Sequence, residues 1–173
     1  MNRDGNVTTH FDSWRVGLLE ALTWDTDSVH LVGVGNPIRR DDAVGLEIVT
    51  RLHSLLGGAP PGLRIHGISP MPERLLSRLA SKGGKVIIFD AIEAAKHPGT
   101  IVCSRLGDTK YGFFATHNVP IRLVPGMATK EDNFYIVGVQ PKSIEIGEGL
   151  TRTVCSSVTK IVSFIVGALE AGR

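Results

Sequence analysis

Apolar residues along the chain follow two different spacings, and the shorter one is typical of strands. Short runs of β-branched and aliphatic residues that stop at Gly, Pro or Asp predict strands buried on both faces of a sheet. The first run, Val29 to Val34, ends at Gly35-Asn36-Pro37, where the proline lacks the N–H that a continuing strand needs. Five strands are predicted, at residues 29–34, 63–68, 85–89, 100–103 and 133–139.

The longer spacing is helical, with apolar residues three or four positions apart. In the clearest stretch, Val44, Ile48 and Leu52 share one face. Glu47 and Arg51 lie outside that face at the favourable i,i+4 spacing. Helices are predicted over residues 13–23, 44–56, 69–82 and 151–171.

Strands that alternate with helices predict an α/β fold. We expect a three-layer sandwich in which a mainly parallel five-stranded sheet is flanked by helices. The 173 residues fit one domain, residues 1–173. Residues 1–27 form an N-terminal extension that contains a short helix.

Polar residues gather between the first strand and the first turn of the next helix. Asn36 and the pair Asp41-Asp42 lie there, at the edge where open α/β sheets bind ligands. An aspartate before a helix is commonly an N-cap, which stabilises the helix by about 1 kcal/mol. One cap explains one aspartate and leaves the second beside its twin, where like charges repel. A cap and a functional site therefore both remain open for this pair.

Two later residues are candidates for the same site. Asp90 follows the apolar run Lys85 to Phe89, so it also falls at the carboxyl end of a predicted strand, near Asp42 if the strands are adjacent. His117 precedes an apolar stretch, although a histidine without a clear pattern is more often structural. Two carboxylates and one imidazole would suit a divalent ion such as Ni²⁺, Zn²⁺ or Mn²⁺, and would leave coordination positions open for catalysis.

Composition excludes several other classes of protein. The net charge of +2 is too small to indicate nucleic-acid binding, and Cys103 and Cys155 lack the spacing of a zinc site or a disulfide framework. No run of the roughly 18 apolar residues that a membrane span needs is evident, and the polar start of the chain is unlike a signal peptide. We therefore expect a cytoplasmic protein.

The glycines near the first strand do not make a dinucleotide site. Gly33-Val34-Gly35-Asn36-Pro37-Ile38 begins like the G-x-G-x-x-G fingerprint, but Ile38 occupies the third glycine position. Two aspartates facing a pyrophosphate would also oppose binding. The sequence contains neither a Walker A motif nor a G-x-S-x-G elbow.

Several ordered blocks, over about residues 29–165, resemble the hydrogenase maturation endopeptidases. That family removes a C-terminal extension from the large subunit of nickel–iron hydrogenases after nickel insertion. The similar blocks are Gly33 to Pro37 with Asp41 to Gly45, Phe89-Asp90-Ala91, Thr116 to Pro120, Ile136 to Pro141 and Gly149 to Thr151. The histidine block and Gln140-Pro141 are most like the hydrogenase 3 (formate hydrogenlyase) branch. Ala43 departs from the pattern, because the family more often has Gly there.

The resemblance implies a metal-dependent protease whose catalytic and nickel-contacting residues are Asp42, Asp90 and His117. It implies that nickel arrives with the precursor rather than being bound tightly by the free protein. The implied partner is the immature large subunit, with no nucleic acid or membrane involved. Asp41 then becomes an N-cap or a supporting acid.

Two other functions remain open from the sequence. A nickel-binding maturation chaperone would use the same residues without cutting the precursor. Peptidyl-tRNA hydrolases also start with Gly-x-Gly-Asn-Pro on an α/β fold, but they would need a strongly basic face, and here Arg39-Arg40-Asp41-Asp42 follows.

Overall fold

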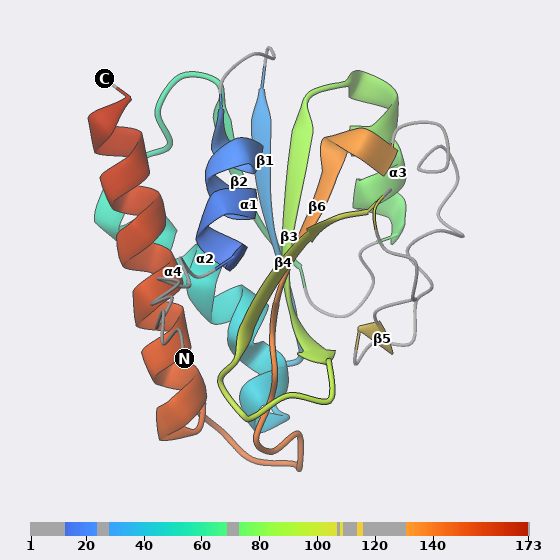
Figure 1. Ribbon diagram of the computed structural model, residues 1–173, viewed down its shortest axis with the longest axis vertical. Coiled ribbons are helices and arrows are strands. Elements are labelled where there is room, and N and C mark those ends of the chain that lie inside the picture. The colour runs from blue at the N-terminus through green and yellow to red at the C-terminus, as the bar shows by residue number, and fades with distance from the viewer. Residues whose placement is uncertain are drawn as a thin grey trace, which may run out of the picture.

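The computed structural model describes residues 13–23, 28–68, 73–106, 108, 114–115 and 131–172. Its central sheet contains, in spatial order, β2 (Leu63–Ile68), β1 (Val29–Val34), β3 (Lys85–Glu93), β6 (Phe134–Val139) and β4 (Ile101–Arg105) (Figure 1). The pairs β1–β2, β1–β3 and β3–β6 are parallel, and the edge strand β4 runs antiparallel to its neighbour β6. The predicted mainly parallel α/β sheet is therefore confirmed.

Strand β3 is longer than the sequence predicts. The apolar run predicts that this strand ends at Phe89 and that a connection follows. In the structure β3 continues to Glu93, where Ile92 and Glu93 pair with the short antiparallel strand β5 (Phe114–Ala115). Because that partner comes from a distant part of the chain, the local pattern around Ala91 carries no sign of the extension.

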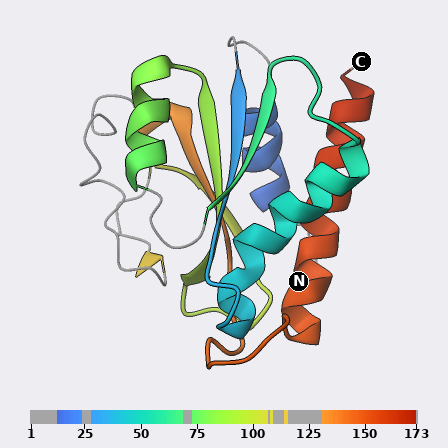
Figure 2. The same cartoon turned by 180° about the vertical axis from the view of Figure 1, so that it is seen from behind.

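Of the helices in the described residues, three cover one face of the sheet and one covers the other (Figures 1 and 2). The first face is covered by α1 (Ser13–Leu22), α2 (Val44–Leu56) and α4 (Arg152–Ala171), and the second by α3 (Glu73–Lys82). Alternation along β1 divides its side chains between the two layers. Leu31 packs with the three-helix layer, and Val32 packs in the cluster that contains Leu76 of α3.

Helix α4 is the one described helix long and apolar enough to cross a membrane, which differs from the expectation that no segment reaches that limit. Its apolar residues form a stripe: Val154, Val158, Ile161 and Ile165 are buried in the core. Lys160, Ser163 and Glu170 lie on its exposed side. This division between a buried apolar face and a polar face is that of a helix in a packed core.

Candidate functional site

The carboxyl ends of β1 and β3 form the switch point of the sheet. From β1 the chain moves outward to β2, and it then returns past β1 to form β3 on the other side. At such a point the connections diverge and leave a crevice, which is where open α/β sheets bind ligands.

Close packing of glycines brings the start of α2 onto these two strand ends. A Cβ atom added to Gly45 would lie 2.1 Å from the Phe89 carbonyl oxygen and 2.3 Å from that of Val34. A Cβ atom on Gly33 would lie 2.3 Å from the Gly45 oxygen. Only hydrogen fits at these distances, so both glycines are needed for the short turn before α2 to reach β3.

That short turn is the 3-10 helix η1 (Arg40–Ala43), and it carries Asp42. The Asp42 N–H donates to the Arg39 carbonyl at 3.0 Å, and the Asp42 carbonyl accepts from the Asn36 N–H at 3.1 Å. The Asn36 side chain closes the loop locally, because its Oδ1 accepts from the Ile38 N–H at 3.2 Å. Asp42 is thus fixed by its backbone beside the end of β1, and its side chain is buried.

Asp90 lies at the same edge. Gly33 pairs with Phe89 in the parallel register of β1 and β3, so Asp90 is the first β3 residue beyond that pair. Its Oδ1 accepts the Ala91 N–H at 2.8 Å, its side chain is buried, and η1 contacts β3. The structure therefore places Asp42 and Asp90 at the same edge of the sheet, as the strand order predicts, and their chemical roles stay a prediction.

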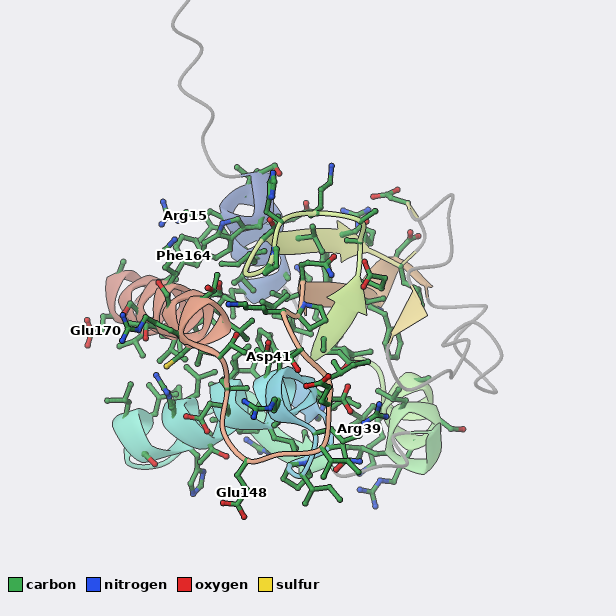
Figure 3. The ribbon with its side chains drawn as sticks, turned by 90° about the horizontal axis from the view of Figure 1, so that it is seen from below. Arg15, Arg39, Asp41, Glu148, Phe164 and Glu170 are labelled. Carbon is green, nitrogen blue, oxygen red and sulfur yellow. The ribbon has the colours of Figure 1, made fainter. Side chains whose placement is uncertain are left out.

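Asp41, the neighbour of Asp42, has a different environment (Figure 3). Its fully buried carboxylate accepts four hydrogen bonds from the segment between β6 and α4. The donors are the Lys142 N–H at 2.9 Å, the Ser143 N–H at 3.0 Å, the Thr151 N–H at 2.7 Å and the Thr151 hydroxyl at 2.9 Å. Asp41 therefore ties the start of α2 to the start of α4.

The alternative that Asp41 caps its own helix is wrong. The N-cap of α2 is Ala43, and no side chain caps it. Asp41 instead places its negative charge at the start of α4, where Thr151 is the N-cap and the helix dipole favours an anion.

Gln140 has a structural role that its position after a strand did not suggest. It is buried, and its Oε1 accepts the Ala94 N–H at 2.9 Å while its Nε2 donates to Glu93 at 3.1 Å. These bonds hold the extension of β3 beyond Asp90. The sequence marks Gln140 as a strand end before Pro141 and as part of a family-like block, and neither feature indicates these hydrogen bonds.

His117, the third predicted site residue, lies outside the described residues. Within the described part of the chain, no group of three or more His, Cys, Asp or Glu side chains is arranged to hold a metal ion. The two carboxylates at the switch point are nevertheless oxygen donors of the kind that divalent cations accept. A single imidazole would complete the three-residue set that the sequence suggests.

Comparison with known proteins identifies one family. Residues 70–168 match the family described as hydrogenase maturation protease. A Methanocaldococcus jannaschii protein, MJ0253, provisionally named a hydrogenase maturation protease, is 28% identical over 148 residues, which cover 81% of this chain and 95% of the relative.

Solved structures share the fold. HycI, a nickel–iron hydrogenase maturation protease from Thermococcus kodakarensis, has a TM-score of 0.74 at 24% identity and covers 88% of this chain and 98% of its own. HybD, a hydrogenase maturating endopeptidase from Escherichia coli, has a TM-score of 0.68 at 24% identity, with 84% and 93% covered. A hydrogenase 3 maturation protease has a TM-score of 0.64 at 20% identity, with 79% and 87% covered.

Proposed function

The chain belongs to the hydrogenase maturation protease family, and we propose that it removes the C-terminal extension of a nickel–iron hydrogenase large-subunit precursor after nickel insertion. Family membership supports a maturation endopeptidase as the general activity. Recognition of nickel and the position of the cut are the parts that we add.

The pairing of Asp42 and Asp90 at one sheet edge is the observation that carries this proposal. Both carboxylates are buried at the switch point of the sheet. Two nearby carboxylates repel each other, and a divalent cation relieves that repulsion. A metal ion presented by a protein substrate therefore has a reason to bind here.

In the proposed mechanism the nickel ion is part of the substrate. Asp42 and Asp90 supply oxygen ligands, His117 supplies a nitrogen ligand, and the remaining positions stay with the precursor and its scissile peptide. A bound divalent ion can polarise the scissile carbonyl or lower the pKa of a bound water, and the proposal accommodates either route. The work of this chain is to orient the ion and the peptide bond relative to each other.

The partner and the compartment follow from the same proposal. The partner is the immature large subunit that still carries its extension. For the compartment we propose the cytoplasm.

Cleavage of purified precursor is the direct test. Nickel-loaded precursor should be shortened by the wild-type protein, as measured by mass spectrometry, and nickel-free precursor should stay intact. Since misplacing a reacting group by about 1 Å costs on the order of 100-fold in rate, Asp42→Ala, Asp90→Ala and His117→Ala should each lower the rate by at least that factor.

Glu170→Ala is the control, because this carboxylate is exposed near the end of α4 and should leave the rate unchanged (Figure 3). Efficient cleavage of nickel-free precursor, or by His117→Ala, would contradict the proposed mechanism. Tight binding of the precursor without cleavage under any metal condition would indicate a chaperone instead.

A further inference from the structure

Two large apolar side chains are exposed on neighbouring loops beside the candidate site. Ile38, in the loop after β1, is 60% exposed, and Ile146, in the loop before α4, is 85% exposed. A single exposed isoleucine is ordinary on a protein surface. This pair is unusual because two segments 108 residues apart in the sequence bring these residues to the same place.

Backbone hydrogen bonds hold the two loops side by side. The Gly147 N–H donates to the Ile38 carbonyl at 3.0 Å, and the Arg40 N–H donates to the Gly147 carbonyl at 2.9 Å. The Arg39 side chain adds a bond from its Nε to the Ile144 carbonyl at 3.1 Å. Ile146 is therefore kept adjacent to Ile38 before any partner binds, which lowers the entropy lost on binding.

The pair lies close to Asp42. The bond from the Asp42 N–H to the Arg39 carbonyl closes a four-residue turn, in which the first and last Cα atoms are less than about 7 Å apart. Adding one residue of about 3.8 Å places the Ile38 Cα within about 11 Å of the Asp42 Cα. A typical protein partner covers about 800 Å² on each side, a patch of about 16 Å radius. A precursor whose scissile bond is held beside Asp42 must therefore cover Ile38 as well.

We propose that Ile38 and Ile146 form an apolar docking rim for the large-subunit precursor, an inference that rests on the proposed function. The rim continues toward α2 as a surface hollow of about 610 Å³, whose lining includes Pro37, Leu46 and Leu150. The precursor would meet it with an apolar side chain close to its nickel site.

Charges of both signs lie around the rim. Arg39 and Arg40 follow Ile38, and Lys142, Glu145 and Glu148 lie in the loop that carries Ile146. Because charges of both signs are present, we expect burial of apolar surface to contribute more to binding than net charge does.

The test compares the double variant Ile38→Ser/Ile146→Ser with the matched control Leu55→Ser. Leu55 is also exposed (65%), but it lies twelve residues after Ala43, and therefore about 18 Å along α2 from the site. Initial rates of cleavage of nickel-loaded precursor give kcat and KM, and binding to immobilised precursor gives Kd. We expect the double variant to raise KM and Kd by about tenfold, equivalent to about 1.4 kcal/mol, with kcat within about twofold of wild type. Leu55→Ser should match wild type.

Equal KM and Kd for wild type and the double variant would overturn the docking rim and leave the proposed function intact. Failure of the wild-type protein to cut nickel-loaded precursor would overturn the proposed function alone, and the comparison of Kd values would still decide the rim. An absence of precursor binding by wild type would overturn both. Thermal melts check that the variants fold, and the single variant Ile146→Ser serves if the double variant does not.

Discussion

Asp41 and Asp42 show how two identical neighbouring side chains take different roles. The Asp41 carboxylate is occupied by four donors, all contributed by residues 142–151. Asp42 instead lies on the turn that contacts β3, the strand that carries Asp90. The N–H groups around the Asp41 carboxylate stabilise its charge, and this offsets the repulsion expected between two adjacent acids.

Removing the Asp41 carboxylate should therefore lower the free energy of unfolding by more than the loss of a helix cap would. A hydrogen bond to a charged group contributes about 1.5–3 kcal/mol, and four partly buried donors would lose their acceptor. We expect Asp41→Ala to lower the free energy of unfolding by at least about 3 kcal/mol, measured by urea denaturation. Glu148→Ala removes an exposed carboxylate from the same loop and should change it by less than about 0.5 kcal/mol. Similar losses of unfolding free energy in the two variants would contradict the role of Asp41 in tying the starts of α2 and α4 together.

Metal binding at Asp42 and Asp90 can be tested without the precursor. Added Ni²⁺ should raise the melting temperature of the free protein, because a cation relieves the repulsion between the two carboxylates. The rise should be small, since the precursor's ligands are absent, and it should shrink in Asp90→Asn.

A second place for nickel must be removed in that experiment. His30 Nδ1 and His66 Nε2 are 3.0 Å apart and offer two imidazoles to an added ion. The melts are therefore best done in a His66→Gln background. If nickel raises the melting temperature equally with and without the Asp90→Asn substitution, the ion binds elsewhere.

At the scale of elements, the sequence predicts what local patterning determines. The helices over residues 44–56 and 151–171 and the strands of the parallel sheet were found from apolar spacing alone. Asp42 and Asp90 could be placed at one edge because both follow predicted strands. Three features are not predictable from the sequence: the extension of β3, the four hydrogen bonds to Asp41 and the hydrogen bonds of Gln140. Their partners lie far away in the chain and leave no local signal.

The contact between α2 and the strand ends makes a prediction about Gly45. A methyl group there would meet two backbone carbonyl oxygens, which cannot move independently of β1 and β3. Gly45→Ala should lower the free energy of unfolding by at least about 2 kcal/mol, since overpacking a core typically costs about 1–3 kcal/mol, and displacement of η1 should slow precursor cleavage.

Gly167→Ala is the matched control for Gly45→Ala. Gly167 also lies inside a helix, α4, but nothing lies within 4 Å of an added Cβ atom. Alanine in a helix interior stabilises the helix by about 1 kcal/mol relative to glycine, so this variant should be slightly more stable than wild type in the same denaturation experiment. Equal stability of the two variants would show that α2 does not press on the strands as described.

At the scale of the whole molecule, different parts of the sheet carry different chemistry. The carboxyl ends of β1 and β3 carry the acids, whereas a histidine pair joins His30, near the amino end of β1, to His66 on the edge strand β2, which β1 separates from β3. His30 and His66 stack with ring centroids 5.3 Å apart, and the Ser28 hydroxyl lies 3.2 Å from His30 Nε2. This separation predicts that the histidine pair affects stability and leaves catalysis unaffected.

Burial is the first cause that lowers the pKa of both histidines below the ordinary value of about 6.5. His30 is further affected by His66, Arg64 and Lys82, and His66 by Arg78 and Arg64. Each folded-state pKa is thus lower than its unfolded value, so the unfolded chain binds more protons in the interval between them. The free energy of unfolding therefore rises with pH across that interval. The part that the two histidines contribute is fully present above pH 6.5 and is lost as the pH falls toward their folded-state pKa values.

The expected outcome is a free energy of unfolding that decreases between pH 7.5 and pH 5, measured by urea denaturation at each pH. His66→Gln should flatten this dependence, because His30 then loses its ionisable neighbour and one shifted group is gone. His53→Gln, which changes an exposed histidine on α2, should keep the wild-type slope. Since the pair lies away from Asp42 and Asp90, His66→Gln should cut the precursor at the wild-type rate at pH 7.5. An unchanged slope in His66→Gln, or a large loss of cleavage at that pH, would contradict the separation of the histidine pair from the two acids.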